Sequence, residues 1–172
     1  QTLGGVFGAG GPAMFVGTHP TWNPGLVQQE ALLPALEAAF FQSGFMPGWF
    51  GESAGHDAAR AAADSIGQDP NEWFLNGWAS QYPVKALIEA AAGNGDLTRA
   101  GVVASLEQLT DVSFDGMLPN QSYVGDPNDS APRQSIINQV DAAGPGGTKT
   151  ATGMFVGPTA EGHDFSAPCF VP

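Results

Sequence analysis

The stretch Phe15-Val16-Gly17-Thr18-His19-Pro20-Thr21-Trp22-Asn23-Pro24-Gly25 joins a short apolar run to a dense polar turn. The run from Ala13 to Val16 is typical of a buried strand, and hydroxyl, imidazole and indole groups follow its carboxyl end. In open α/β sheets, ligands bind beyond the carboxyl ends of the strands. The stretch therefore predicts an α/β sheet whose strand carries this loop to a cleft.

The composition indicates one globular unit with an acidic surface. The chain has 172 residues, of which 42% are hydrophobic, which is enough to bury a core in one domain. Lys and Arg number 5 against 17 Asp and Glu, for a net charge of −12. Such a surface repels phosphate backbones and anionic lipid headgroups, so we expect no nucleic-acid partner and no membrane-surface binding.

The two ends of the chain carry few chemical signals. Cys169 is the sole cysteine, so it is either an inert thiol or a partner for a cysteine of another chain. Gly5, Gly8 and Gly10 do not have the spacing of a dinucleotide-binding loop, and we predict no cofactor. Gln1 follows no initiator Met or basic segment, as expected at a cleavage boundary. No apolar run is long enough for a membrane helix.

Helical periodicity and capping residues predict most of the middle of the chain. Pro70 and Thr98 stand where helices begin, with Asp69 and Thr98 as caps, and Pro83 must kink or split a long helix. The predicted segments are a short helix over Leu26–Leu33, an extended segment over Leu36–Gln42, and helices over His56–Ile66, Pro70–Ala92 and Arg99–Leu109.

The last third of the chain has a different pattern. Gln134–Val140 alternates Ile with polar residues, as in a half-buried strand. From Ala142 onward we predict glycine turns, one short apolar run over Met154–Val156 and little other structure.

The order of these elements resembles that of one protein family. The segments that carry the resemblance are Pro12–Gly25, the helices between His56 and Ala92, Asp96-Leu97-Thr98-Arg99 with its helix, and Phe114-Asp115-Gly116 followed by a return strand. Together they are similar to the C-terminal portion of type I periplasmic substrate-binding proteins, the branched-chain amino acid receptors of ABC transporters.

The resemblance implies an α/β fold with two lobes, of which this chain supplies only a portion. Residues 1–45 would belong to the second lobe, with its strand, ligand loop and helix. Residues 46–134 would supply helices and a strand of the first lobe, and residues 135–172 the return crossing and a tail. Most of the first lobe's sheet would be missing, so an N-terminal segment or a second chain would have to complete the fold.

The resemblance also implies a function. The chain would be a non-catalytic, extracytoplasmic protein, periplasmic or extracellular, that captures a small polar ligand and delivers it to the membrane subunits of an ABC transporter. In family members that bind branched-chain amino acids, the loop after the strand offers an acidic residue to the ligand's ammonium group. His19 stands at that position here, which widens the ligand class from amino acids to small acids, amides or aromatics.

Five residues form the predicted ligand site. Thr18 and Thr21 can donate hydrogen bonds, and Trp22 can form an apolar wall. Trp73 stands near the position of an aromatic ligand contact in the family. Each has a purely structural alternative: an exposed loop for His19, helix capping for the threonines, and core packing for the two tryptophans.

Two other functions are compatible with the residues. One is a ligand-sensing receptor domain of the same fold. The other is an esterase-like hydrolase, because Gly51-Glu52-Ser53-Ala54-Gly55 has the G-x-S-x-G spacing, although the residues before it form a poor strand. We read Asp126-Pro127-Asn128-Asp129 as a solvated turn, since it lacks the later ligands of a calcium loop. His163, Asp164 and Cys169 have no predicted element to position them.

Overall fold

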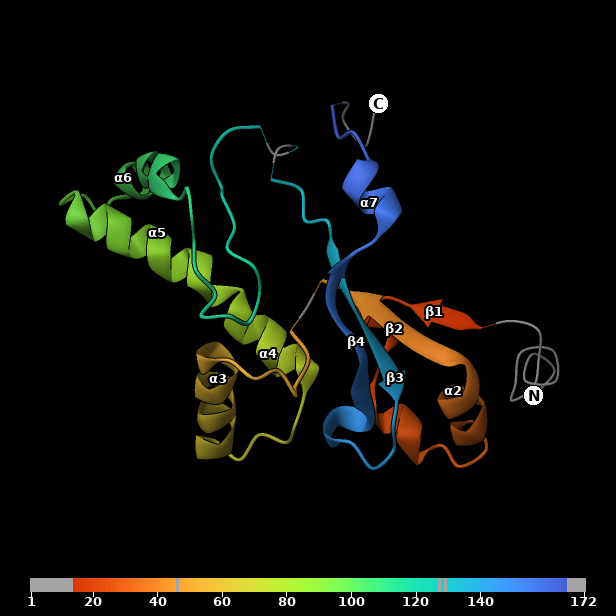
Figure 1. Ribbon diagram of the computed structural model, residues 1–172. Helices are drawn as coiled ribbons and strands as arrows, with labels where there is room; N and C mark the ends of the chain where they lie inside the picture. Colours follow the sequence, from red (N-terminus) through yellow and green to blue (C-terminus); the bar gives the residue numbers. More distant parts are fainter. Residues whose placement is uncertain (1–13, 46, 127, 129, 167–172) are drawn as a thin grey trace.

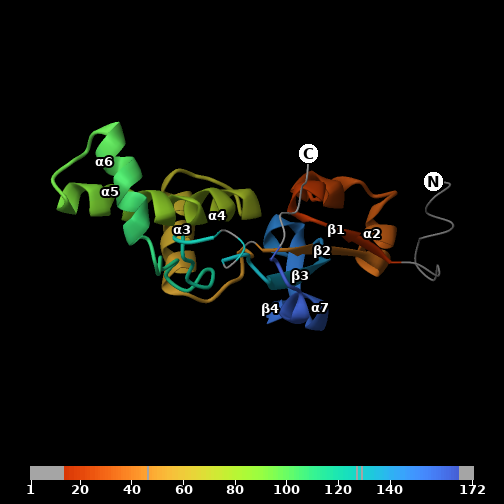
Figure 2. The ribbon, with the colours of Figure 1, turned by 90° about the horizontal axis from the view of Figure 1, so that it is seen from above.

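The computed structural model describes residues 14–45, 47–126, 128 and 130–166. It divides into a sheet part (residues 14–45 and 134–166) and a helical part (residues 47–126), which lie side by side (Figures 1 and 2). The chain leaves the sheet part after β2, builds the helical part, and returns to the sheet at β3. Pro47, just after the first crossing, has a fully buried side chain.

The sheet part is a four-stranded mixed sheet in the order β1-β2-β3-β4. β1 (Phe15–Gly17) pairs in parallel with β2 (Phe40–Gly44), with Phe15 opposite Phe40. β3 (Gln134–Val140) is antiparallel to β2, and β4 (Thr148–Val156) is antiparallel to β3. The predicted α/β class is confirmed, but among the described strands only the β1–β2 pair is parallel.

The connection between β1 and β2 differs from the prediction. It contains two 3₁₀ turns, η1 (His19–Thr21) and η2 (Pro24–Gln28), and then helix α2 (Leu33–Ala39). The predicted helix over Leu26–Leu33 is therefore wrong, and the extended segment begins at Phe40 instead of Leu36. Pro34 explains the difference, because it lies in the first turn of α2, where its missing amide proton costs nothing.

The C-terminal region has more structure than we predicted. A glycine turn, η4 (Pro145–Gly147), joins β3 to β4, and a short helix α7 (Pro158–Gly162) follows β4. The nine residues of β4 are mostly exposed and include threonines, a lysine and a glycine. An exposed edge strand of this composition has little hydrophobic alternation, so the sequence gives almost no strand signal.

The helical part begins with α3 (Ala54–Ser65), α4 (Glu72–Ala79) and α5 (Gln81–Gly93). The predicted helix over His56–Ile66 is confirmed. The long helix is split at Ser80, before Pro83, so that Pro83 falls in the first turn of α5. The predicted cap Asp69 is wrong: Asn71 caps α4 by accepting a hydrogen bond from the Trp73 amide at 2.8 Å.

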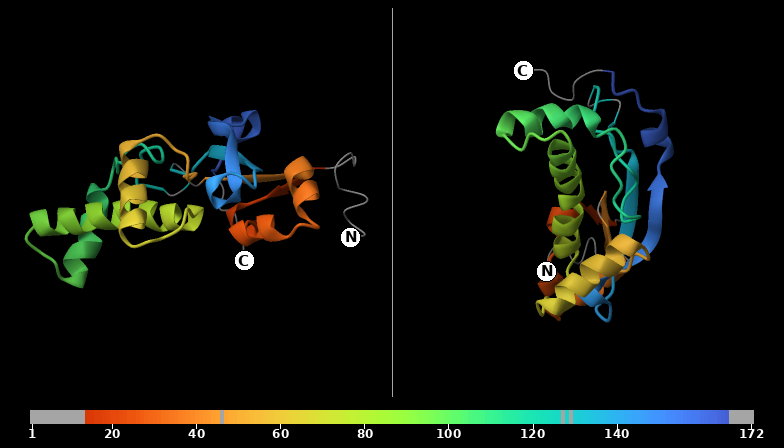
Figure 3. Two further views of the ribbon diagram at one scale, coloured as in Figure 1. Left: turned by 90° about the horizontal axis from the view of Figure 1, so that it is seen from below. Right: turned by 90° about the vertical axis from the view of Figure 1, so that its left-hand side faces the viewer.

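The rest of the helical part packs across the end of α5. α6 (Arg99–Ala104) continues into the 3₁₀ turn η3 (Ser105–Gln108), and Figure 3 shows it crossing α5. Thr98 caps α6, as predicted, by accepting from the Gly101 amide at 3.2 Å. Gly101 has no room for a side chain, since a Cβ there would lie 2.4 Å from the Asp96 carbonyl oxygen.

The helical part has its own hydrophobic core, centred on α3 and α4. Leu75 is fully buried there, and Trp49 and the segment after η3 close the core from the other side. The buried members are Trp49, Ala59, Ala63, Leu75, Ala79, Leu109, Val112, Phe114 and Met117. Alanines on α3 allow α4 to approach closely, so one large side chain fills the space between the helices.

We predict that Leu75→Ala lowers the free energy of unfolding by about 2–5 kcal/mol, because it leaves a cavity in this core. The matched control is Leu97→Ala, which removes the same atoms from a side chain that is 64% exposed and should change stability by less than about 0.5 kcal/mol. Chemical denaturation of both variants checks this. Equal effects would contradict the assigned core.

Candidate functional site

The loop that follows β1 is closed by the hydroxyl group of Thr21. Thr21 donates from its Oγ1 to the Thr18 carbonyl oxygen at 2.6 Å, and both threonines are exposed. Gly17 makes the tight turn possible, because a Cβ there would lie 2.0 Å from Thr21 Oγ1. The loop therefore presents a fixed backbone with two accessible threonines at the carboxyl end of a strand.

His19 of this loop is buried, with only 4% of its surface exposed. Its ring lies over the end of β2, where a Cβ on Gly44 would come within 3.1 Å of its Nδ1 atom. The ring also makes an edge-to-face contact with Trp73 of α4, with 6.0 Å between ring centroids. The predicted alternative of an exposed loop histidine is wrong, and two predicted site residues from distant segments meet here.

Glu72, which the sequence analysis did not select, lies at the centre of the contact between the two parts. Its Oε2 atom is 3.3 Å from His19 Nε2, and its Oε1 atom accepts from Thr148 Oγ1 at 2.9 Å. Asn138 Nδ2 approaches the same Oε1 at 3.4 Å and donates to Gln42 Oε1 at 3.0 Å. We call His19, Gln42, Glu72, Asn138 and Thr148 the Glu72 cluster.

All five members of the Glu72 cluster are buried, with exposed fractions between 1% and 5%. A buried carboxylate is costly unless other groups hydrogen-bond to it or pair with it. Among the described residues, Glu72 Oε2, both ring nitrogens of His19 and Asn138 Oδ1 have no aligned hydrogen-bond partner. Hence the 3.3 Å approach between His19 and Glu72 is a close contact without hydrogen-bond geometry. These polar atoms of the cluster could therefore still form hydrogen bonds.

The two predicted tryptophans have different environments. Trp22 is 4% exposed, stacks on Phe40 and donates from its indole nitrogen to the Gly146 carbonyl oxygen at 3.1 Å. It thereby fastens the loop after β1 to the turn before β4. Trp73 is 41% exposed, so part of its indole is open to a ligand.

The signal for Glu72 in the sequence is weak. A glutamate in the first turn of a helix is common, because it complements the positive end of the helix dipole, and it is usually exposed. Gln42, Asn138 and Thr148 belong to strands, where alternate residues face the same side. Only the tertiary contact between α4 and the sheet brings these groups together.

Ser53 and His56 form a pair at the start of α3. Ser53 is the N-cap, and its Oγ lies 2.7 Å from His56 Nδ1. A nucleophile elbow requires a strand before the serine, whereas residues 47–52 contain none in the structure and Ser53 has ordinary extended backbone angles. His56 Nε2 is buried and has no partner among the described residues. This geometry is that of a helix cap.

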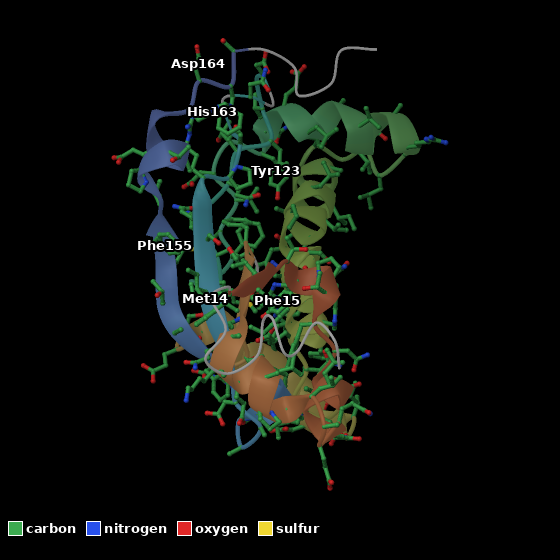
Figure 4. All side chains as sticks on the ribbon, turned by 90° about the vertical axis from the view of Figure 1, so that its right-hand side faces the viewer. Met14, Phe15, Tyr123, Phe155, His163 and Asp164 are labelled. Carbon is green, nitrogen blue, oxygen red and sulfur yellow. The ribbon has the colours of Figure 1, made fainter. Side chains whose placement is uncertain are left out.

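Other candidate groups are kept apart from the Glu72 cluster. His163 follows α7 directly and packs edge-on against Phe165, at 4.5 Å between ring centroids. Figure 4 shows it beside Asp164 and away from Met14 and from Phe15 of β1. Cys169 and two members of the Asp126–Asp129 turn lie outside the described residues. Within the described ranges, no three His, Cys, Asp or Glu side chains are grouped to hold a metal.

A hollow of about 400 Å³ is formed jointly by the two parts. It is lined by the end of β2, the loop near Asn120, the start of β3 and the end of β4, and it includes none of the predicted site residues. Arg133 at its edge is engaged elsewhere, since it donates to the His163 carbonyl oxygen at 2.7 Å.

No helix among the described residues is long and apolar enough to cross a membrane.

Comparison with known proteins identifies the fold. The structure matches a fatty acid ABC transporter substrate-binding protein from Thermomonospora curvata, with a TM-score of 0.78 and 22% identity over 91% of this chain. It also matches a branched-chain amino acid ABC transporter protein from Thermus thermophilus, solved with bound valine, with a TM-score of 0.52 and 16% identity over 86% of this chain. The chain spans 40% of the length of each of these structures. No protein-family model matches the sequence, and the search of curated proteins found no significant match.

We predict that His56 titrates below its ordinary pKa of 6.5, because burial disfavours its charged form and the Arg60 guanidinium repels it. The unfolded chain then binds more protons than the folded one as the pH falls through about 6.5, so this histidine lowers stability on acidification. Between about pH 7 and about pH 5, which lie on either side of the ordinary histidine pKa, the free energy of unfolding should fall less in the His56→Gln variant than in the wild type. Denaturant curves at the two pH values measure this. Identical pH dependence in the two proteins would contradict this environment.

Proposed function

We propose that this chain is part of an extracytoplasmic solute-binding protein that delivers a small polar ligand to the membrane subunits of an ABC transporter. The observation that carries the proposal is the fold, which is shared with a fatty acid ABC transporter substrate-binding protein and with a branched-chain amino acid ABC transporter protein. The arrangement of the site supports it, because a loop at the carboxyl end of a parallel strand meets a helix from the other part of the chain.

The ligand would bind where the two parts face each other. Thr18 and Thr21 offer hydroxyl groups from the sheet part, and Trp73 offers a half-exposed indole from the helical part. His19 and Trp22 would support this surface from below, since both are buried. A ligand that touches both parts favours the arrangement in which they are close, which is how cleft closure is coupled to binding.

The exposed apolar side chains support the proposal that further structure completes the fold. Val16 of β1, the edge strand of the sheet, is 68% exposed, and Met14, just before this strand, is 70% exposed. Val84 and Ile88, one helical turn apart on α5, are also about half exposed. Exposed large apolar side chains that group on one element often mark contacts with other protein. A preceding segment of the same protein or a second chain would cover it.

The function is tested by a thermal-shift screen of the native protein against fatty acids, branched-chain amino acids, and small acids and amides. We predict that one class raises the midpoint of unfolding, and that calorimetry gives a dissociation constant that Trp73→Ala weakens at least about tenfold, because an aromatic wall is lost. Trp73→Phe should retain most of the affinity. Leu97→Ala, at the far end of the helical part, is the control.

Two results would count against this assignment. If no class of solute shifts the unfolding midpoint, the proposed solute-binding function is wrong. If a solute binds with unchanged affinity to Trp73→Ala but weakly to Asn120→Ala, the ligand occupies the hollow near Asn120 and the site is misplaced.

A further inference from the structure

We propose that Glu72 is a latch that sets how the helical part lies against the sheet part, and that its carboxylate acts by positioning other groups and does not itself bind ligand. The proposal rests on the proposed function only where it predicts how Glu72 affects the affinity for a solute. The geometry that carries it is the convergence on one buried carboxylate of side chains from η1, β3 and β4.

The contacts of Glu72 cross from one part to the other. Glu72 begins α4 in the helical part, whereas His19, Asn138 and Thr148 all belong to the sheet part. Each part also has internal support: Asn138 is held by Gln42 on the neighbouring strand, and α4 is held by the core around Leu75. The cluster therefore joins the helical part to the sheet part.

Because Glu72 and His19 are buried, their contacts strongly influence how the helical part lies against the sheet part. The Glu72 side chain is 6% exposed and that of His19 is 5% exposed. If the parts rotate away from each other without water entering, the carboxylate loses its donors in an apolar setting, which is strongly unfavourable. If water enters, the charge becomes solvated and the cost falls. The carboxylate thus favours two arrangements over intermediate ones. In one, the two parts are in contact and the carboxylate is hydrogen-bonded within the protein. In the other, the parts are separated and water solvates the carboxylate.

The latch has a direct consequence for the ligand surface. Trp73 follows Glu72 on α4, and His19 precedes the exposed Thr21 in η1. Fixing Glu72 on His19 and Thr148 therefore fixes Trp73 relative to the threonines of the loop. When only a fraction of molecules has the binding arrangement, the apparent dissociation constant rises by the inverse of that fraction.

The test measures the distance between the two parts without ligand. Spin labels are placed on exposed positions of the native protein by Asp64→Cys on α3 and Thr152→Cys on β4, with Cys169→Ser to remove the natural thiol. Double electron–electron resonance then gives the distance distribution. We expect a narrow distance distribution for the protein with Glu72. For Glu72→Ala we expect either a broader distribution or a second population at a different distance.

Conservative and matched variants separate the latch from general damage. Glu72→Gln keeps an oxygen that accepts from Thr148 and Asn138, so it should restore most of the narrow population. Asp57→Asn removes a carboxylate from the first turn of α3, where it pairs with Arg60 on the exposed surface, and should leave the distance distribution unchanged. If Glu72→Ala fails to fold, Thr148→Val removes one donor at nearly constant shape and should broaden the distribution to a lesser degree.

The proposal is overturned if folded Glu72→Ala, or folded Thr148→Val, gives the same distance distribution as the wild type. It is also overturned if Glu72→Gln is as broad as Glu72→Ala. These outcomes do not depend on a ligand, so they are distinct from failure of the solute screen. Where a solute is found, we expect Glu72→Ala to weaken its binding by about tenfold, as a binding arrangement populated at about one tenth requires.

Discussion

The buried carboxylate of Glu72 is the constraint on which the arrangement of this protein depends. An ionisable group that is almost wholly removed from water must find its hydrogen bonds inside the protein. Here they come from Thr148 and Asn138, with His19 in close contact, and all three lie across the junction. Because a buried acceptor must keep its donors, the hydrogen bonds to Glu72 specify one position of α4 against the sheet.

The rest of the structure prepares the two sides of this junction. On the sheet side, Gly17 and Gly44 leave room for the loop and for the His19 ring, and Trp22 ties that loop to the turn before β4. On the helical side, the small residues of α3 let Leu75 of α4 sink into the core. The loop after β1 and the start of α4 thus lie against each other, in a fold shared with an ABC transporter substrate-binding protein.

The sequence predicted the features that depend on local chemistry. Helix α3, the Thr98 cap and strand β3 all follow from periodicity or capping residues. It did not predict β4, because an exposed edge strand lacks hydrophobic alternation. Nor did it predict Glu72, because a glutamate in a first helical turn is indistinguishable from an ordinary dipole partner until the tertiary contact buries it. Whether the predicted ligand residues contact a solute stays a prediction.

The most direct measurement of the central claim is a double-mutant cycle between Glu72 and Thr148. The free energies of unfolding of the wild type, Glu72→Ala, Thr148→Val and the double variant are obtained from denaturant curves. A hydrogen bond to a buried charge across the junction predicts a coupling of about 1–3 kcal/mol, with the double variant less damaged than the sum of the single ones. Additivity within about 0.3 kcal/mol would mean that the two side chains do not interact, and would contradict the account.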